Sequence, residues 1–164
     1  MLPNLDAIVA ATEFTDSKYH GEGEAVAQNL DIYPDGHLLY RARQEGAWVE
    51  IPLDVEAREP KRLLLNMTRS YDFGKYQAYL DGVKLGGVMD LYSEEIASRE
   101  YHLLDFWPEP GKYALRLECV GKNPQSTGYY LGIESVRLRQ RRPRVKEYGH
   151  DKDKDWRKKP ILYR

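Results

Sequence analysis

The chain has 164 residues, of which 41% are hydrophobic, and this composition is typical of one folded domain rather than of a disordered chain. Its single cysteine excludes an intrachain disulfide, and the lack of an apolar run of about 18 residues predicts no membrane-spanning helix. The charge is uneven. Residues 139–164 contain 11 Lys and Arg against 4 Asp and Glu, a net charge of +7, which leaves residues 1–138 with 14 basic and 22 acidic residues, a net charge of −8. This division suggests that the basic tail docks on the acidic body or meets a partner.

Apolar residues at every second position predict a chain made of short β-strands. The predicted strands lie at residues 5–14, 25–32, 37–42, 48–55, 62–68, 75–86 (as a hairpin), 99–106, 112–120 and 129–139. Between the first strand and Tyr40 the pattern is irregular, so those early strands sit within a long loop. Pro52 cannot donate a hydrogen bond to a neighbouring strand, and it therefore predicts an edge position or a bulge.

The clearest local signal is a hairpin. Two extended runs are joined by Asp81-Gly82, a pair typical of turns in which both central residues have positive φ. We expect Gly86-Gly87 to end this hairpin.

Two further details concern the last strands. The inward row through residues 113, 115 and 117 continues to Cys119, which we expect to be a buried small hydrophobe. The apolar parity changes between Ile133 and Val136, and this change predicts a bulge or a bend.

Strands of this number and spacing predict an all-β fold: a two-sheet antiparallel β-sandwich with jelly-roll topology. We assign residues 1–139 to the sandwich. Residues 140–164 lose the strand pattern and are predicted to form a basic, extended or disordered tail, with residues 161–163 as a short apolar anchor.

Two stretches are candidates for binding a ligand through aromatic stacking and hydrogen bonds to hydroxyl groups. The first contains Tyr71 and Asp72, and the second contains Asn123, Tyr129 and Tyr130. Each also has a structural reading: Asp72 suits a turn in which its side chain bonds its own backbone, and the second stretch suits an ordinary polar connection.

Residues 90–95 (DLYSEE) concentrate oxygen atoms and could hold a structural calcium ion, although their spacing matches no defined motif. No other cofactor is expected, because the four histidines show no metal-ligand spacing and no nucleophile, zinc-protease or phosphate-loop signature is present. The first residues lack a basic and an apolar leader region. The chain is therefore expected to be either cytoplasmic or a mature or excised part of a longer exported protein.

Three motifs in order carry a resemblance: residues 71–86 (YDFGKYQAYLDGVKLG), residues 90–92 (DLY) and residues 120–134 (VGKNPQSTGYYLGIE). Together they resemble jelly-roll accessory domains, galactose-binding-like and carbohydrate-binding-module-like, of bacterial polysaccharide-processing proteins and glycoside hydrolases. The resemblance covers residues 5–138. It implies a sandwich with a non-catalytic role beside an enzyme, sugar binding by loops at one end, and in some members a structural calcium.

The leading hypothesis is therefore a carbohydrate-binding or accessory module, not an enzyme, that binds a poly- or oligosaccharide through Tyr71, Asp72, Asn123, Tyr129 and Tyr130. A catalytic domain or other protein is a further candidate partner, through the tail, whereas the acidic residues interleaved in that tail argue against nucleic acid. Two alternatives stay open. One is a structural domain that mediates oligomer or interdomain contacts, and the other is a small glycoside hydrolase with spatially paired carboxylates.

Overall fold

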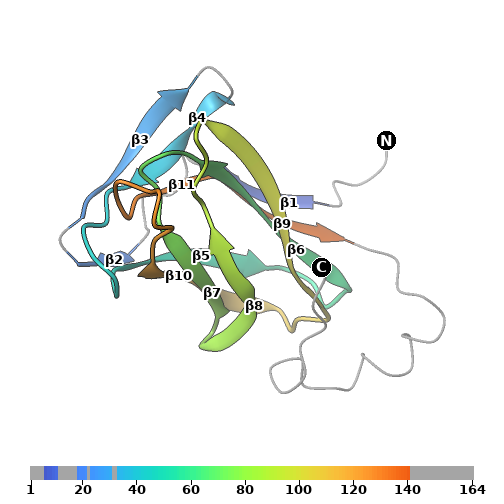
Figure 1. Cartoon of the computed structure of the whole chain (residues 1–164). Coiled ribbons are helices and arrows are strands. Elements are labelled where there is room, and N and C mark those ends of the chain that lie inside the picture. Colours follow the sequence, from blue (N-terminus) through green and yellow to red (C-terminus); the bar gives the residue numbers. More distant parts are fainter. Residues whose placement is uncertain (1–5, 11–17, 22, 31–32, 141–164) are drawn as a thin grey trace.

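The computed structural model of the chain describes residues 6–10, 18–21, 23–30 and 33–140, and these residues form strands and connecting loops without any helix (Figure 1). None of the described elements is therefore a helix suited to crossing a membrane. The strands are β1 (Asp6–Ala10), β2 (Lys18–His20), β3 (Ala25–Leu30), β4 (Tyr33–Tyr40), β5 (Trp48–Val55), β6 (Lys61–Arg69), β7 (Lys75–Leu80), β8 (Val83–Asp90), β9 (Ala97–Phe106), β10 (Gly111–Gly121) and β11 (Leu131–Gln140).

The strands form two antiparallel sheets. The order in the six-stranded sheet is β3-β4-β11-β6-β9, with β1 also paired to β11, and the order in the five-stranded sheet is β2-β5-β10-β7-β8. β4 pairs with residues 131–133 of β11, and β1 pairs with residues 135–139 of β11. β4 and β1 therefore pair with successive parts of β11.

The pairing is that of a hairpin rolled up on itself. From β4 onwards the innermost pair is β7 with β8, and around it lie β6 with β9, β5 with β10, and β4 with β11. Successive pairs fall alternately in the two sheets, which is jelly-roll topology. The predicted fold class is confirmed for the described residues.

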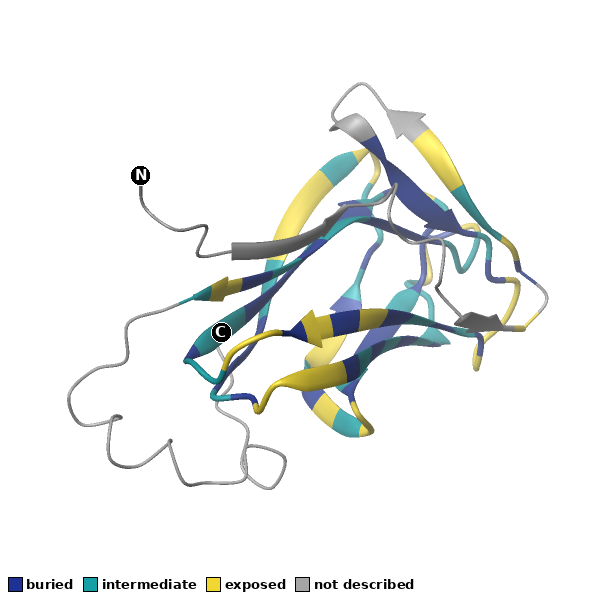
Figure 2. Cartoon of the chain, turned by 180° about the vertical axis from the view of Figure 1, so that it is seen from behind, coloured by how far each residue is buried: buried dark blue, intermediate teal, exposed yellow. Residues whose placement is uncertain are grey.

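The core lies between the sheets. Figure 2 shows the buried positions as dark bands that alternate with exposed ones along the strands. In β10 the inward row of Tyr113, Leu115, Leu117 and Cys119 is buried as predicted. Removing such apolar area from water stabilises the fold by about 1.5–3 kcal/mol for each large side chain.

Most strand predictions agree with the structure to within about two residues, and β5 matches residue for residue. The strand predicted at 37–42 instead spans Tyr33–Tyr40, and β2, β3 and β4 occupy much of the stretch expected to be a long loop. The three-residue strand β2 was not predicted, because it is too short for alternation to show. Within the described residues β2 pairs with β5 only at Trp48–Glu50. Pro52 lies beyond this pairing, where that edge of β5 is free, so the N–H that proline lacks is not needed for a hydrogen bond there.

The predicted turn at Asp81-Gly82 is present, with φ of 47° and 82° at the two residues. The expectation that Gly86-Gly87 ends the hairpin is wrong, since β8 continues to Asp90. The strand tolerates the glycines through an irregularity in its register opposite residues 76–78, where Gly86 adopts a positive φ of 63°.

The parity change in the last strand is a bulge. The register of β11 against β6 shifts between Ile133 and Ser135, and this shift returns Val136 and Leu138 to the core side. The predicted bulge is confirmed. β11 itself ends at Gln140, and residues 141–164 lie outside the described part, so the tail, its anchor and the domain division at 139 stay predictions.

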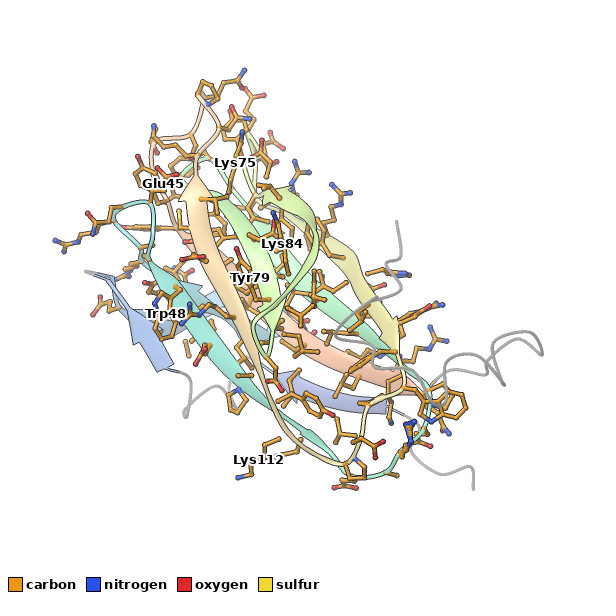
Figure 3. The ribbon with its side chains drawn as sticks, turned by 90° about the horizontal axis from the view of Figure 1, so that it is seen from below. Glu45, Trp48, Lys75, Tyr79, Lys84 and Lys112 are labelled. Atoms are coloured by element: carbon orange, nitrogen blue, oxygen red, sulfur yellow. The ribbon has the colours of Figure 1, made fainter. Side chains whose placement is uncertain are left out.

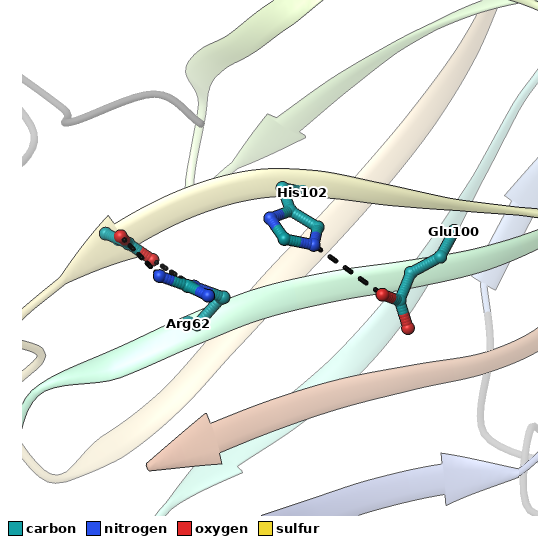
Figure 4. Close-up of polar contacts among 4 residues, drawn as sticks. Arg62, Glu100 and His102 are labelled. Carbon is teal, nitrogen blue, oxygen red and sulfur yellow. Dashed lines mark hydrogen bonds and ion pairs between the residues drawn. The ribbon is translucent and has the colours of Figure 1, made fainter. Parts of the chain in front are cut away.

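The surface of the six-stranded sheet that faces away from the core, its outer face, also carries a buried charge. Asp105 is 1% exposed and receives two hydrogen bonds from Arg62, at 3.0 and 3.4 Å, across the β6–β9 pair (Figure 4). On the same strand His102 lies 3.6 Å from Glu100. A two-point guanidinium–carboxylate contact satisfies a buried carboxylate, and it also fixes the register of β9 on β6.

Replacing Gly82 by Ala should lower the free energy of unfolding by about 1–2 kcal/mol, because a Cβ atom disfavours the left-handed backbone that the turn requires. No atom lies within 4 Å of the added Cβ, so the cost is one of backbone conformation alone. Gly87→Ala is the matched control in the same hairpin, also with open space around its Cβ but without a positive φ. Urea denaturation of both variants makes the comparison, and equal stabilities would contradict the assigned turn.

Candidate functional site

Two loops that are distant in sequence lie against each other at one end of the sandwich. The 70–74 loop joins β6 to β7, and the 126–130 loop leads into β11. The amide of Thr127 donates to the carbonyl of Tyr71 at 3.1 Å, and the amide of Tyr130 donates to the carbonyl of Asp72 at 3.1 Å. The loops thus satisfy part of each other's backbone hydrogen bonding, which fixes their relative position.

Ser126 secures this contact from the inside. Its side chain is 3% exposed, and its hydroxyl donates to the carbonyl of Phe73 at 2.7 Å while it accepts from the amide of Gly128 at 3.3 Å. A buried hydroxyl with both functions satisfied is a stable anchor. The contact brings the two predicted binding stretches together.

A pocket of about 320 Å³ opens beside this contact, over the outer face of the six-stranded sheet. The pocket is lined by Gln28, His37, Leu39, Arg41, Thr68, Ser70, Tyr71, Asp72, Phe73, Ile96 and Tyr130. Its walls therefore come from β3, β4 and the residue after it, the end of β6, the two loops, and Ile96 in the connection between β8 and β9. The lining mixes aromatic rings with amide, hydroxyl and charged groups, which is typical of a site that orients a polar ligand.

The floor of the pocket holds a fixed, neutral histidine. His37 is 1% exposed, with Nε2 at 2.7 Å from the amide oxygen of Gln28 and Nδ1 at 2.7 Å from the hydroxyl of Thr68. Because the amide oxygen only accepts, Nε2 carries the proton and Nδ1 accepts from Thr68. Burial lowers the pKa of His37 from 6.5 to about 4.

His37 reaches Thr68 across β11, at the position of Gly132. A Cβ atom at residue 132 would lie 2.6 Å from Nδ1 of His37 and 2.9 Å from Cβ of Thr68. Only glycine leaves room for the imidazole to cross the strand there. The position of His37 in the pocket floor therefore depends on glycine at residue 132.

Of the five predicted site residues, Tyr71, Asp72 and Tyr130 line the pocket. The side chain of Tyr71 is the most exposed large hydrophobic one among the described residues, at 56%. Burial raises the pKa of Asp72, and hydrogen bonds from its own backbone and from Ser70 oppose that shift. Asp72 therefore bonds its own backbone and also lines the pocket, so its structural and its binding interpretation are compatible.

The other two predicted residues, Asn123 and Tyr129, do not line the pocket. The amide of Asn123 donates to Asp90 at 2.9 Å, and its oxygen accepts from the backbone of Gln125 at 2.9 Å. The carbonyl of Tyr129 accepts from the hydroxyl of Tyr76, and Lys122 lies 5.9 Å from the centre of its ring. Both residues thus make contacts that stabilise the end of the sandwich.

Sequence reasoning missed the pocket residues that come from the strands. Gln28 lies on β3, His37 on β4 and Arg41 just after β4. His37 bonds Gln28 and Thr68 across strands, and Arg41 bonds Glu24, which precedes β3. Alternation marks Gln28 and His37 as outward-facing, but it does not say which loop folds over them. Only the sheet order could have identified these residues.

A second group of aromatic side chains lies on the outer face of the five-stranded sheet, where Figure 3 shows Trp48 and Tyr79. The guanidinium of Arg116 lies 4.0 Å from the centre of the Trp48 ring and 3.5 Å from Glu50. That guanidinium covers the indole, whereas the Tyr71 ring is mostly exposed. The pocket is therefore the better site for stacking a ligand.

The expected calcium ligands can also be placed. Asp90 uses one carboxylate oxygen to accept from the amide of Tyr92 at 3.1 Å and the other to accept from Asn123. Among the described residues no group of three or more His, Cys, Asp or Glu side chains is arranged to hold a metal ion.

The chain is similar to known jelly-roll structures. Part of a Paenibacillus xanthan lyase matches 73% of this chain at 25% identity with a TM-score of 0.61, and this chain spans only 12% of the lyase's length. The CBM36-1 domain of a multidomain xylanase from the hindgut metagenome of Trinervitermes trinervoides matches 84% of this chain and 99% of its own length, at 14% identity and a TM-score of 0.55. The carbohydrate-binding module CBM6cm-2 of Cellvibrio mixtus lichenase 5A, whose structure contains cellotriose, matches 83% of this chain and 98% of its own length, at 10% identity and a TM-score of 0.52.

No protein-family model matches the chain, and no curated protein matches it. The structural similarities define the class of fold. The chain has the jelly-roll sandwich of carbohydrate-binding modules, and the predicted resemblance is confirmed at that level.

The lowered pKa of His37 predicts an acid-sensitive fold. Between pH 6.5 and 4 the unfolded chain binds a proton at His37 and the folded chain does not. The contribution of His37 to the free energy of unfolding is therefore fully present above pH 6.5 and is lost as the pH falls toward 4. From pH 7 to pH 5 we expect this residue to cost roughly 2 kcal/mol of the free energy of unfolding.

Urea denaturation at both pH values tests this expectation, with a His37→Gln variant in which the loss should be smaller. His102→Gln, which removes a histidine elsewhere on the same sheet, should keep the wild-type loss. An equal loss in wild type and His37→Gln would contradict the assignment.

Proposed function

We propose that this chain is a non-catalytic carbohydrate-binding or accessory module that acts beside a glycan-processing enzyme, and that the pocket between Tyr71, Asp72 and Tyr130 holds the sugar. The observation that carries the proposal is the pairing of an exposed tyrosine ring with polar groups in one pocket of a jelly roll. Several jelly rolls of the same fold are carbohydrate-binding modules, and one of them was solved with cellotriose.

The chemistry of the pocket suits a sugar. A pyranose ring has an apolar face that stacks on an aromatic ring, and its edge carries hydroxyl groups that donate and accept hydrogen bonds. Tyr71 and Tyr130 supply the rings, Asp72 is an acceptor, and Arg41 is a donor whose guanidinium is held by Glu24 at 2.7 Å. A volume of about 320 Å³ is at the small end of ligand pockets, which favours a short stretch of a glycan over a long one.

The same lining argues against hydrolysis. Glycosidases use two carboxyl groups on opposite sides of the bond that they cleave. Asp72 is the single carboxylate among the pocket's lining residues, and Asp90 is engaged with Asn123 and Tyr92. The accessory role also agrees with the xanthan lyase, in which the matching region is a small part of a long chain. The structural alternative depends on the basic tail, which lies outside the described residues.

Replacing Tyr71 or Tyr130 by Ala should weaken glycan binding about tenfold each, because each removes one stacking ring while the backbone bonds of its loop remain. Asp72→Asn should weaken binding as well, since an amide is a poorer acceptor than a carboxylate. Tyr79→Ala, on the outer face of the other sheet, is the matched control and should bind like wild type.

Affinity gel electrophoresis and calorimetry with cello-, xylo- and manno-oligosaccharides and with xanthan provide the measurement. Lack of retention on every polysaccharide of a broad panel, with and without calcium, would refute the proposal. Binding that all three pocket variants leave unchanged would refute the assigned site.

A further inference from the structure

Two arginines and a tyrosine meet at the open edge of the sandwich, between the edge strands β8 and β9. Arg99 of β9 is paired with Met67 of β6, and Tyr101 is paired with Leu65, so both extend from the core-facing side of the sheet, where Tyr101 is half-buried and Arg99 is exposed. Arg69 follows Met67 by two residues and is the diagonal neighbour of Arg99 on that side, a spacing that long side chains bridge.

These side chains are close in space. The guanidinium of Arg99 lies 4.7 Å from the centre of the Tyr101 ring. Burial raises the pKa of the Tyr101 phenol, while the charges of both Arg99 and Arg69 lower it, as expected when two cations lie near one hydroxyl.

The three side chains carry more donors than the described residues satisfy. The Nε atom of Arg69 and the hydroxyl of Tyr101 are both buried, and Nε has no hydrogen-bond partner among the described residues. The side chain that acts on the Tyr101 hydroxyl by hydrogen bonding is that of Arg99, which is itself a donor, so the O–H proton has no acceptor there. Arg69 places another nitrogen 2.8 Å from the carbonyl of Tyr92, which holds the side chain in position. A buried donor without a partner costs about 1–3 kcal/mol, so two of them at one place call for an acceptor.

The two guanidinium groups also lack a direct ion pair among the described residues. Neither Arg69 nor Arg99 forms an ion pair with a described residue. The charge of the Asp90 carboxylate acts on Tyr101, and both oxygens of Asp90 already accept hydrogen bonds from Tyr92 and Asn123. Glu94 and Glu95 lie exposed on the connection between β8 and β9. Two neighbouring cations, a free N–H and a free O–H are the groups that bind an oxyanion.

We propose that Arg69, Arg99 and Tyr101 form an oxyanion site that holds a carboxylate or sulfate group of an acidic glycan. Ser70 and Ile96, which line the pocket, follow Arg69 and precede β9, so the site lies at the same end of the six-stranded sheet as the pocket but on its opposite, core-facing side. A glycan that passes from the pocket over the sheet edge at Ile96, where β9 is the edge strand, would bring an acidic substituent to the arginines. The glycan part of this inference rests on the proposed function, whereas the oxyanion part does not.

The first test uses the full chain and inorganic sulfate. Nuclear magnetic resonance of ¹⁵N-labelled protein follows the Nε–H signal of Arg69 during titration with sodium sulfate at constant ionic strength. We expect a saturable shift that weakens about tenfold or more in Arg99→Gln. Arg116→Gln, which removes a guanidinium from the other sheet, should leave it unchanged. A shift that does not saturate, or that Arg99→Gln retains, would overturn the site.

Tyr101→Phe gives a sharper test, because it removes only the buried hydroxyl. Without anions the variant should be as stable as wild type or more stable, since an unsatisfied donor is lost. Its affinity for sulfate should nevertheless fall about tenfold. Lower stability without anions, with unchanged sulfate affinity, would mean that the hydroxyl serves the fold and not a ligand.

The final test compares a glucuronate-containing oligosaccharide and a sulfated one with their neutral counterparts, which distinguishes the carboxylate from the sulfate source. We expect the acidic forms to bind about tenfold more tightly, and Arg99→Gln to abolish that preference while neutral binding persists. Neutral binding without any acidic preference would overturn this inference and leave the proposed function standing. Sulfate binding without any glycan binding would support the oxyanion site and refute the proposed function.

Discussion

Buried backbone amides and carbonyls need partners, and at the end of this sandwich the partners come from another part of the chain. The 70–74 loop and the 126–130 loop exchange three amide–carbonyl bonds, and the buried hydroxyl of Ser126 joins them. Neither loop has regular structure of its own, so this mutual satisfaction sets their shape. The position of Tyr71, Asp72 and Tyr130 follows from it, and so does the pocket.

The sandwich could be predicted from the sequence to a large extent because its signals are local. Alternation marked β5 residue for residue, the Asp81-Gly82 pair marked the turn, and a change of parity marked the bulge in β11. The errors have local causes too. β2 is too short to alternate, and Gly86-Gly87 resembles a chain break although the strand absorbs both glycines in an irregular register.

The candidate site could be predicted only in part. Tyr71, Asp72 and Tyr130 were recognisable because they lie in loops rich in aromatic and polar groups. Asn123 and Tyr129 have the same composition but serve the framework, and composition does not separate the two roles. Gln28 and His37 were missed because the sheet order, and not any motif, brings β3 and β4 beneath the 70–74 loop.

The nested pairing of the strands has a consequence for how the domain assembles. Hairpin contacts between neighbouring strands cost little loop entropy, and each outer pair closes a longer loop than the one inside it. We expect folding to begin at the β7–β8 hairpin and to proceed outward, with β4 and β11 pairing last. Gln28 and Tyr130 belong to the outermost layers, so the pocket would be completed at the end of folding. A nascent chain released from the ribosome before β11 would hold much of the framework and none of the finished recognition surface.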